Sequence, residues 1–219
     1  MSIREDFQRA RTEHEKSARR EEILDAAERL VRGAANDRFA ISAVAEKVGV
    51  SKSTIFLYFA NKEELLLALY ERAFQRFFTR LRQSLTEGMS GRAFCEAFID
   101  SALVNPTMLI LRAQLAHTIE RSVQLDSMIS AKQKILKGGM ACAERMELVL
   151  DMKAGYGLRV LMALINLLSG AVQADAQPYV DMDALPDDVA NLIRTAETRK
   201  VFLSGAEFVI TGATGRAFG

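Results

Sequence analysis

Residues 47–62 are rich in side chains that bind phosphate oxygens, and they contain no Asp or Glu. Lysine ammonium groups and the hydroxyl groups of Ser, Thr and Tyr commonly hold the sugar-phosphate backbone of nucleic acids. In this segment they are Lys47, Ser51, Lys52, Ser53, Thr54, Tyr58 and Lys62. The chain of 219 residues has 29 basic and 28 acidic side chains, a net charge of +1. The local pattern, and not the total charge, therefore indicates a nucleic acid partner; the alternative is a solvated polar surface.

The apolar residues around this segment predict the helices that position it. Apolar side chains recur at intervals of three and four residues, which predicts helices at about 19–33, 41–48, 52–58 and 62–85. Gly49 ends the second helix, and Ser51 is a suitable N-cap for the third. Three short helices and a long one, with a tight glycine turn between the second and third, are typical of a helix-turn-helix. The second helix of that motif, here the third predicted helix, is the recognition helix that enters the major groove of DNA.

The rest of the chain is also predicted to be helical. Further helices are expected at about 94–104, 106–119, 125–150, 158–174 and 188–211, and no alternating strand pattern persists. The chain has only 3 prolines, which leaves room for long helices. We expect an all-α protein with a polar extension over residues 1–18 and a DNA-binding domain over 19–65, its motif lying at 40–59. A second helical domain is expected over 66–219.

Residues 20–74 resemble the tetracycline-repressor-like (TetR) family of transcriptional regulators. The resemblance rests on Ile23-Leu24-Asp25-Ala26-Ala27, Val44-Ala45, Gly49-Val50-Ser51, Thr54-Ile55-Phe56, Tyr58-Phe59 and Asn61-Lys62-Glu63-Glu64-Leu65-Leu66. It implies a homodimeric regulator, most often a repressor, that binds a palindromic operator in double-stranded DNA and is released by a small molecule. The resemblance further implies that residues 66–219 bind that ligand and form the dimer. It also implies DNA contacts for Ser42, Ser51, Lys52, Ser53, Thr54, Phe56, Tyr58 and Lys62.

Three residues depart from the pattern of that family. The family usually has Thr where Ala40 stands, and it often has Gly in place of Ser53 and Tyr in place of Phe56. Ala40 has no side chain that can cap a helix, and Phe56 has no hydroxyl to bond a phosphate. These departures support the alternative hypothesis, an all-α small-molecule-binding protein or enzyme that has lost DNA binding.

The second domain contains candidate residues for an apolar ligand cavity. Eight of the nine methionines follow Gly88, and methionine side chains adapt to varied ligands. His117, on an apolar helix, is a candidate hydrogen-bonding partner for the ligand. The candidate pocket residues are Phe74, Phe78, Phe94, Phe98, Met108, His117, Met128, Met140 and Met162. For each of them the alternative is ordinary packing in the core.

The last predicted helices have the composition of a dimer face. Two such helices from each subunit form a four-helix bundle across a two-fold axis. The candidate interface residues are Leu158, Leu161, Met162, Ile165, Leu168, Val172, Val189, Ile193, Phe202, Gly205, Ala206 and Val209. A two-fold dimer presents two recognition helices to successive major grooves, which favours a palindromic operator.

The sequence offers little support for metal, cofactor or catalytic chemistry. Cys95 and Cys142 form no C-x-x-C pair, and the only imidazoles, His14 and His117, have no recognisable nucleophile motif. We therefore expect two reduced thiols, no cofactor and no enzymatic activity.

The chain also lacks the expected features of a secreted or membrane protein. Its most apolar stretch, residues 156–174, is interrupted by Arg159 and Asn166, so we expect a helix buried in protein and not a membrane span. Residues 1–6 contain no apolar stretch typical of a secretory signal. We therefore expect a cytoplasmic protein.

Overall fold

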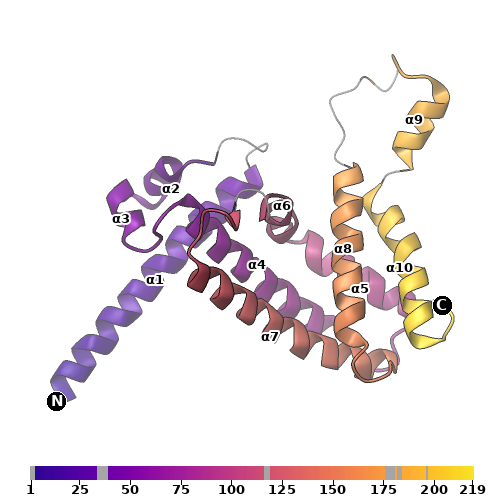
Figure 1. Ribbon diagram of the computed structural model, residues 1–219, viewed down its shortest axis with the longest axis horizontal. Coiled ribbons are helices and arrows are strands. Elements are labelled where there is room, and N and C mark those ends of the chain that lie inside the picture. Colours follow the sequence, from indigo (N-terminus) through magenta and orange to yellow (C-terminus); the bar gives the residue numbers. More distant parts are fainter. Residues whose placement is uncertain (1–2, 34–38, 116–118, 176–180, 182–183, 196) are drawn as a thin grey trace. The chain divides into compact units, whose positions relative to one another are not determined.

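The computed structural model describes residues 3–33, 39–115, 119–175, 181, 184–195 and 197–219. Every regular element in these residues is a helix (Figure 1), which confirms the expected all-α class. The helices are α1 (Ile3–Gly33), α2 (Ile41–Val48), α3 (Lys52–Phe56), α4 (Lys62–Ser84), α5 (Gly91–Leu103), α6 (Thr107–Gln114), α7 (Leu125–Leu150), α8 (Gly157–Asp175), α9 (Asp187–Arg194) and α10 (Thr198–Thr214).

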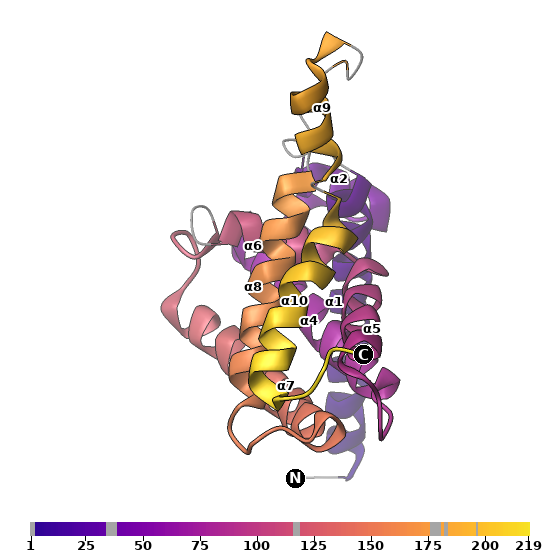
Figure 2. The ribbon, with the colours of Figure 1, turned by 90° about the vertical axis from the view of Figure 1, so that its right-hand side faces the viewer.

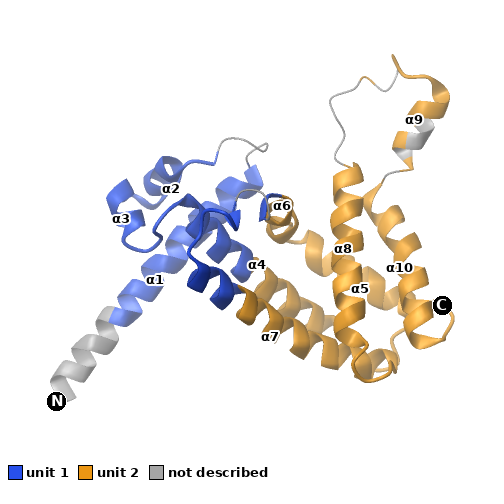
Figure 3. Cartoon of the chain, viewed as in Figure 1, with its two compact units in different colours: residues 1–72, 114–131 blue, residues 73–113, 132–219 orange. Residues whose placement is uncertain are grey.

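The chain divides into two compact units (Figure 3). Unit 1 consists of residues 1–72 and 114–131, and unit 2 of residues 73–113 and 132–219. Helices α4 and α7 each have residues in both units. The predicted domain limits at residues 18 and 65 stay predictions.

Unit 1 is built on the apolar face of α1. Ile23, Leu24 and Ala27 of this face are fully buried, and α2 packs on α1 and on α3. Helix α1 begins at Ile3, so the polar extension is continuous with the first helix, and its residues 13–18 are exposed. Helix α1 therefore supports α2, and α2 in turn contacts α3.

In unit 2, α10 lies alongside α8 and α5 (Figures 1 and 2). The ring of Phe202 on α10 stacks on Phe98 of α5 with centroids 5.5 Å apart. On the α8 side, a Cβ at Gly205 would lie 2.9 Å from both δ carbons of Leu167, so glycine permits this close approach. The two contacts make α10 part of the core of its own chain.

Several helix boundaries differ from the predicted ones: α1 begins at Ile3, α5 begins at Gly91 and α6 ends at Gln114. Two further differences have a local cause. Helix α3 ends at Phe56 and not at Tyr58, because the Tyr58 amide donates to the carbonyl of Ile55 (3.0 Å) in a tighter turn. The single helix predicted at 188–211 is two helices, α9 and α10. The amide and hydroxyl of Thr198 both donate to Asp175 at the end of α8 (3.0 and 2.6 Å), which fixes a new helix start. These bonds also lower the pKa of the Asp175 carboxyl.

Helix α8 is long and apolar enough to cross a membrane. Among the described residues, α5 and α6 reach such a length and apolarity only when they are taken together, and this pair is bent by 75°. A core helix of a soluble protein has the same length and composition. Leu161, Leu164 and Leu168 of α8 are buried within the chain, where α8 packs on α10.

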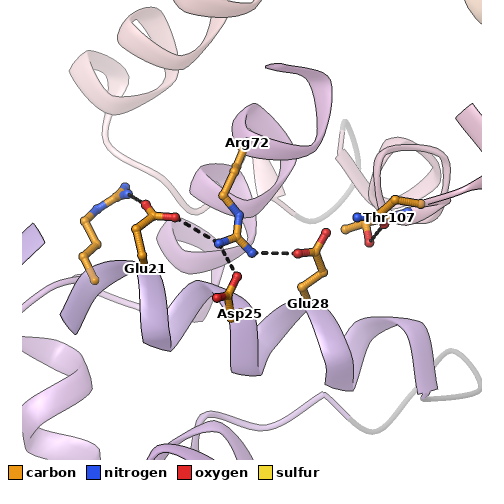
Figure 4. Close-up of polar contacts among 7 residues, drawn as sticks. Glu21, Asp25, Glu28, Arg72 and Thr107 are labelled. Carbon is orange, nitrogen blue, oxygen red and sulfur yellow. Dashed lines mark hydrogen bonds and ion pairs between the residues drawn. The ribbon is translucent and has the colours of Figure 1, made fainter. Parts of the chain in front are cut away.

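A half-buried arginine joins α1 to α4 inside unit 1. Glu21, Asp25 and Glu28 occupy one face of α1, at intervals of four and three residues, and all three contact Arg72 (Figure 4). The nitrogen–oxygen distances are 3.1, 2.8 and 2.8 Å, and the side chains of Arg72 and Glu28 are only 12% and 9% exposed. One guanidinium, at the point where α4 passes from unit 1 to unit 2, therefore binds three carboxylates of α1.

We predict that Arg72→Met lowers the free energy of unfolding by about 2 kcal/mol, because it leaves the buried carboxylate of Glu28 without this cation. Urea unfolding followed by circular dichroism measures the change. Arg19→Met is the matched control. Its pair with Glu22 is as short (2.6 Å) but solvent-exposed, so the loss should stay below about 0.5 kcal/mol. Equal losses in the two variants would show that burial of the Arg72 pair is unimportant.

Candidate nucleic-acid interface

The turn between α2 and α3 is set by Gly49. Its φ of +72° lies in the left-handed region that suits glycine, and its amide donates to the carbonyls of Ala45 and Glu46 at the end of α2. The Val50 amide then donates to the carbonyl of Ala45 (2.9 Å). The predicted glycine turn is therefore confirmed, and it fixes the direction in which α3 leaves α2.

Ser51 caps α3 as the sequence predicted. Its hydroxyl accepts a hydrogen bond from the Thr54 amide (3.1 Å), and its backbone is extended at φ −77° and ψ 157°. The same oxygen lies 2.7 Å from the Ser53 hydroxyl and 2.9 Å from the Thr54 hydroxyl. Three of the predicted DNA-binding hydroxyls are thus gathered at the start of α3.

Side-chain exposure divides the predicted DNA-binding residues into two groups. The exposed ones are Ser42, Ser51, Lys52, Ser53 and Phe56, and the half-buried ones are Thr54, Tyr58 and Lys62. The Lys62 ammonium lies 5.6 Å from the ring centroid of Phe39, within the range of a cation–π contact. The structure therefore places most of these polar groups where a large partner can reach them.

Ala40 occupies the N-cap position of α2 and provides no side-chain hydrogen bond. Its carbonyl still accepts from the amides of Ala43 (3.1 Å) and Val44 (3.3 Å). The second helix therefore forms without the side-chain cap that is usual in proteins of this pattern.

Sequence reasoning missed two features of unit 1. Leu57, directly after α3, is 83% exposed. At the start of α4, the Asn61 side chain donates to the carbonyl of Ser122 (2.8 Å), and the Glu64 carboxylate accepts from the amide of Gln124 (2.9 Å). No sequence signal identifies such contacts, because the partners lie about 60 residues apart.

The candidate pocket residues do not form one group in the structure. Phe74, Phe78, Phe94, Phe98 and Met108 are buried, Met128 is half-buried in unit 1, and Met140 and Met162 are exposed on unit 2. His117 lies outside the described residues. A surface pocket of about 480 Å³ in unit 2 is lined by other residues, namely Thr79, Arg82, Gln83, Ala141, Glu144, Arg145 and Leu148.

Several candidate dimer residues pack inside their own chain. Leu161, Ile165, Leu168, Phe202 and Ala206 are buried, and Leu158, Val172, Ile193, Gly205 and Val209 are half-buried. Met162 and Val189 are exposed, and so is Phe208 of α10, which sequence reasoning did not select. Phe208 is 78% exposed and is the most exposed large apolar side chain of that helix.

Comparison with known protein families covers most of the chain. A family model described as "Bacterial regulatory proteins, tetR family" matches residues 23–69. A second model, "Tetracyclin repressor-like, C-terminal domain", matches residues 71–212. The chain belongs to the TetR family of bacterial regulatory proteins. The predicted class of regulator, with a helix-turn-helix DNA-binding domain followed by a helical C-terminal domain, is thereby confirmed.

The individual proteins to which the chain is similar match it over a short segment or at low sequence identity. A fatty acid metabolism regulator protein of Bacillus subtilis (strain 168) is 32% identical over 66 residues, which are 30% of this chain and 34% of that protein. The chain thus spans about a third of this curated relative.

Two solved structures share the fold across nearly the whole chain. The reduced form of NemR from Escherichia coli is 21% identical with a TM-score of 0.56, covering 90% of this chain and 98% of that one. A transcriptional regulator from Cytophaga hutchinsonii is 17% identical with a TM-score of 0.54, covering 88% and 96%.

The two cysteines of this TetR-family protein are buried. Burial raises the pKa of the Cys95 thiol to about 12, and the neighbouring Glu96 carboxylate acts in the same direction. Burial also raises the pKa of Cys142 to about 12, although Arg82 partly opposes it. Both thiols are therefore protonated and unreactive near neutral pH.

We predict that neither thiol of the folded protein reacts with a disulfide reagent at pH 8, whereas both react in denaturant. Raising a thiol pKa from 9 to about 12 lowers the thiolate fraction at pH 8 about 1000-fold. Absorbance of the released thiolate measures the rate. The same rise in pKa makes the free energy of unfolding decrease as the pH rises from 9 toward 12, because in that range only the thiols of the unfolded chain ionise. Rapid labelling of the folded protein would contradict the burial.

Proposed function

We propose that this protein is a homodimeric transcriptional regulator, a repressor in its simplest form, that binds a palindromic operator and is released by a small molecule. The observation that carries the proposal is the surface formed by Gly49, Ser51 and α3. It combines a fixed turn, clustered hydroxyls and the exposed Lys52 with the absence of acidic residues from 47 to 62. Such a surface suits the phosphates and base edges of a major groove.

The release mechanism that we propose acts through α4. This helix begins in unit 1 and continues into unit 2, which includes most of the segment matched by the C-terminal family model. Asn61 and Glu64 also hold residues 122–124 to its first turn. A ligand that binds the low-affinity arrangement more tightly shifts the equilibrium and releases DNA. The buried Phe and Met side chains of unit 2 favour a largely apolar effector.

The family assignment favours this regulator over the alternative of an all-α carrier or enzyme without DNA binding. The match to the fatty acid metabolism regulator covers only 30% of the chain, so it supports a regulatory role and no particular effector. We propose that the protein acts on cytoplasmic DNA and that its role is regulatory and not catalytic.

Selection from random double-stranded DNA at low salt, followed by anisotropy titration, tests the proposal. We expect one palindromic sequence to be enriched. Lys62→Ala should weaken binding to the operator and to unrelated DNA by similar factors and reduce the slope of log K against log salt by about 1. Lys153→Ala, which removes an exposed lysine of unit 2, is the matched control and should leave the slope unchanged.

Two results would contradict the proposal at different levels. If no sequence is enriched and low salt does not promote binding, the protein is not a DNA-binding regulator. If an operator is found but the salt slope of Lys62→Ala equals that of the unmodified protein, Lys62 does not contact a phosphate.

The dimer is tested at Phe208. We propose that its exposed ring extends the apolar surface of α8 and α10 into the subunit interface, where Met162 is also exposed. Phe208→Glu would place a charge there and should raise the dimer dissociation constant at least ~100-fold, as measured by analytical ultracentrifugation. Leu148→Glu, at an equally exposed leucine of α7, should stay dimeric. Unchanged dimerisation of Phe208→Glu would move the interface away from this residue.

A further inference from the structure

Two adjacent apolar side chains are exposed at the end of α3, the recognition helix of the helix-turn-helix. Phe56 is 47% exposed and Leu57 is 83% exposed. Their neighbours Ile55 and Phe59 are buried, at 0% and 4% exposure, and supply the contacts that this segment makes with the core. Phe56 and Leu57 therefore contribute little burial to the fold, and neighbouring exposed apolar groups commonly mark an interaction surface.

These side chains share a face of α3 with the polar residues that begin it. Phe56 follows Lys52 by four residues, and Leu57 follows Ser53 by four residues. The backbone of Leu57 remains right-handed helical at φ −71° and ψ −20°, so the helical spacing extends through it. A partner that docks on Lys52 and Ser53 therefore meets an apolar surface one helical turn further along.

The chemistry of the two side chains limits what they recognise. Neither can donate or accept a hydrogen bond, so neither can bind a phosphate oxygen or the polar edge of a base. The apolar group that a major groove offers is the C5 methyl of thymine. Phe56 also departs from the tyrosine that is frequent in similar sequences, and the loss of its hydroxyl removes a phosphate contact and leaves an apolar one.

We propose that Leu57 and Phe56 read thymine methyl groups in each half of the operator, with Leu57 as the principal determinant. The inference rests on the proposed function, since it assumes that α3 enters a major groove. It adds a sequence preference to that function: the operator carries thymine where the C-terminal end of α3 docks, and the methyl group itself contributes to affinity.

Replacement of thymine by 2′-deoxyuridine tests this directly, because it removes the methyl group and retains the base-pairing edge. The full-length protein is titrated with the selected operator, in which the thymines of each half-site are replaced one position at a time. At the position that Leu57 contacts, we expect binding to weaken about fourfold for each methyl removed. In Leu57→Ala the same replacement should cause no further loss, and in Leu57→Met the sensitivity should persist.

Two controls separate methyl recognition from other effects. Leu148→Ala truncates another exposed leucine, at 75% exposure in unit 2, and should discriminate thymine from uracil as the unmodified protein does. Leu57→Ala should also retain the salt slope of the unmodified protein, since no phosphate contact is lost. Phe56→Ala is tested in the same way at neighbouring thymines.

The possible failures are distinct. If the selected palindrome is bound equally well with thymine and with uracil, or if Leu57→Ala loses as much as the unmodified protein on replacement, methyl recognition is wrong while the regulator remains. If selection enriches no sequence, the proposed function fails and this inference fails with it.

Discussion

The recognition helix is too short to hold itself in place, and everything proposed for this protein depends on what orients it. A helix of five residues is unstable alone, because nucleation costs more than so few hydrogen bonds return. Burial of Ile55 and Phe59 anchors it in unit 1, and the Arg20 guanidinium lies 5.0 Å from the Phe59 ring centroid. The left-handed turn at Gly49 then sets its direction. Once these side chains are fixed inward, helical spacing turns Lys52, Ser53, Phe56 and Leu57 outward.

Helix α4 is likewise held by contacts with other elements, and it has residues in both compact units. Within unit 1, polar contacts hold it at two points: at its first turn, through Asn61 and Glu64, and at Arg72, the last residue of α4 in that unit. The Arg72 contacts are ion pairs in a partly buried site. Removing one partner from such a site strongly destabilises the fold, because the charge of the other partner is no longer compensated. A helix held this firmly on one side is well suited to transmit a displacement that begins in the other unit, which is the mechanism we propose for effector release.

Charge distribution matters more here than total charge. A protein with a net charge of +1 gains little from bulk attraction to DNA, so its affinity has to come from local contacts, shape and dimer spacing. An apolar contact with a thymine methyl adds affinity that salt does not screen. The exposed Leu57 and Phe56 therefore complement a weakly basic surface.

The sequence by itself determined the helical class, the helix-turn-helix and the cap at Ser51, because these follow from local spacing, from the φ that glycine permits and from short-range hydrogen bonds. It also identified the apolar residues of the second domain, yet not which of them face inward. Tertiary structure alone decided that Phe202 and Ala206 are core residues while Phe208 is exposed, and that Asp175 starts α10 by binding Thr198. It likewise decided that Arg72 meets three carboxylates more than 40 residues away in sequence. The physical reason is that burial and ion pairing depend on which elements pack together, and residue type and spacing along one helix do not specify the partner.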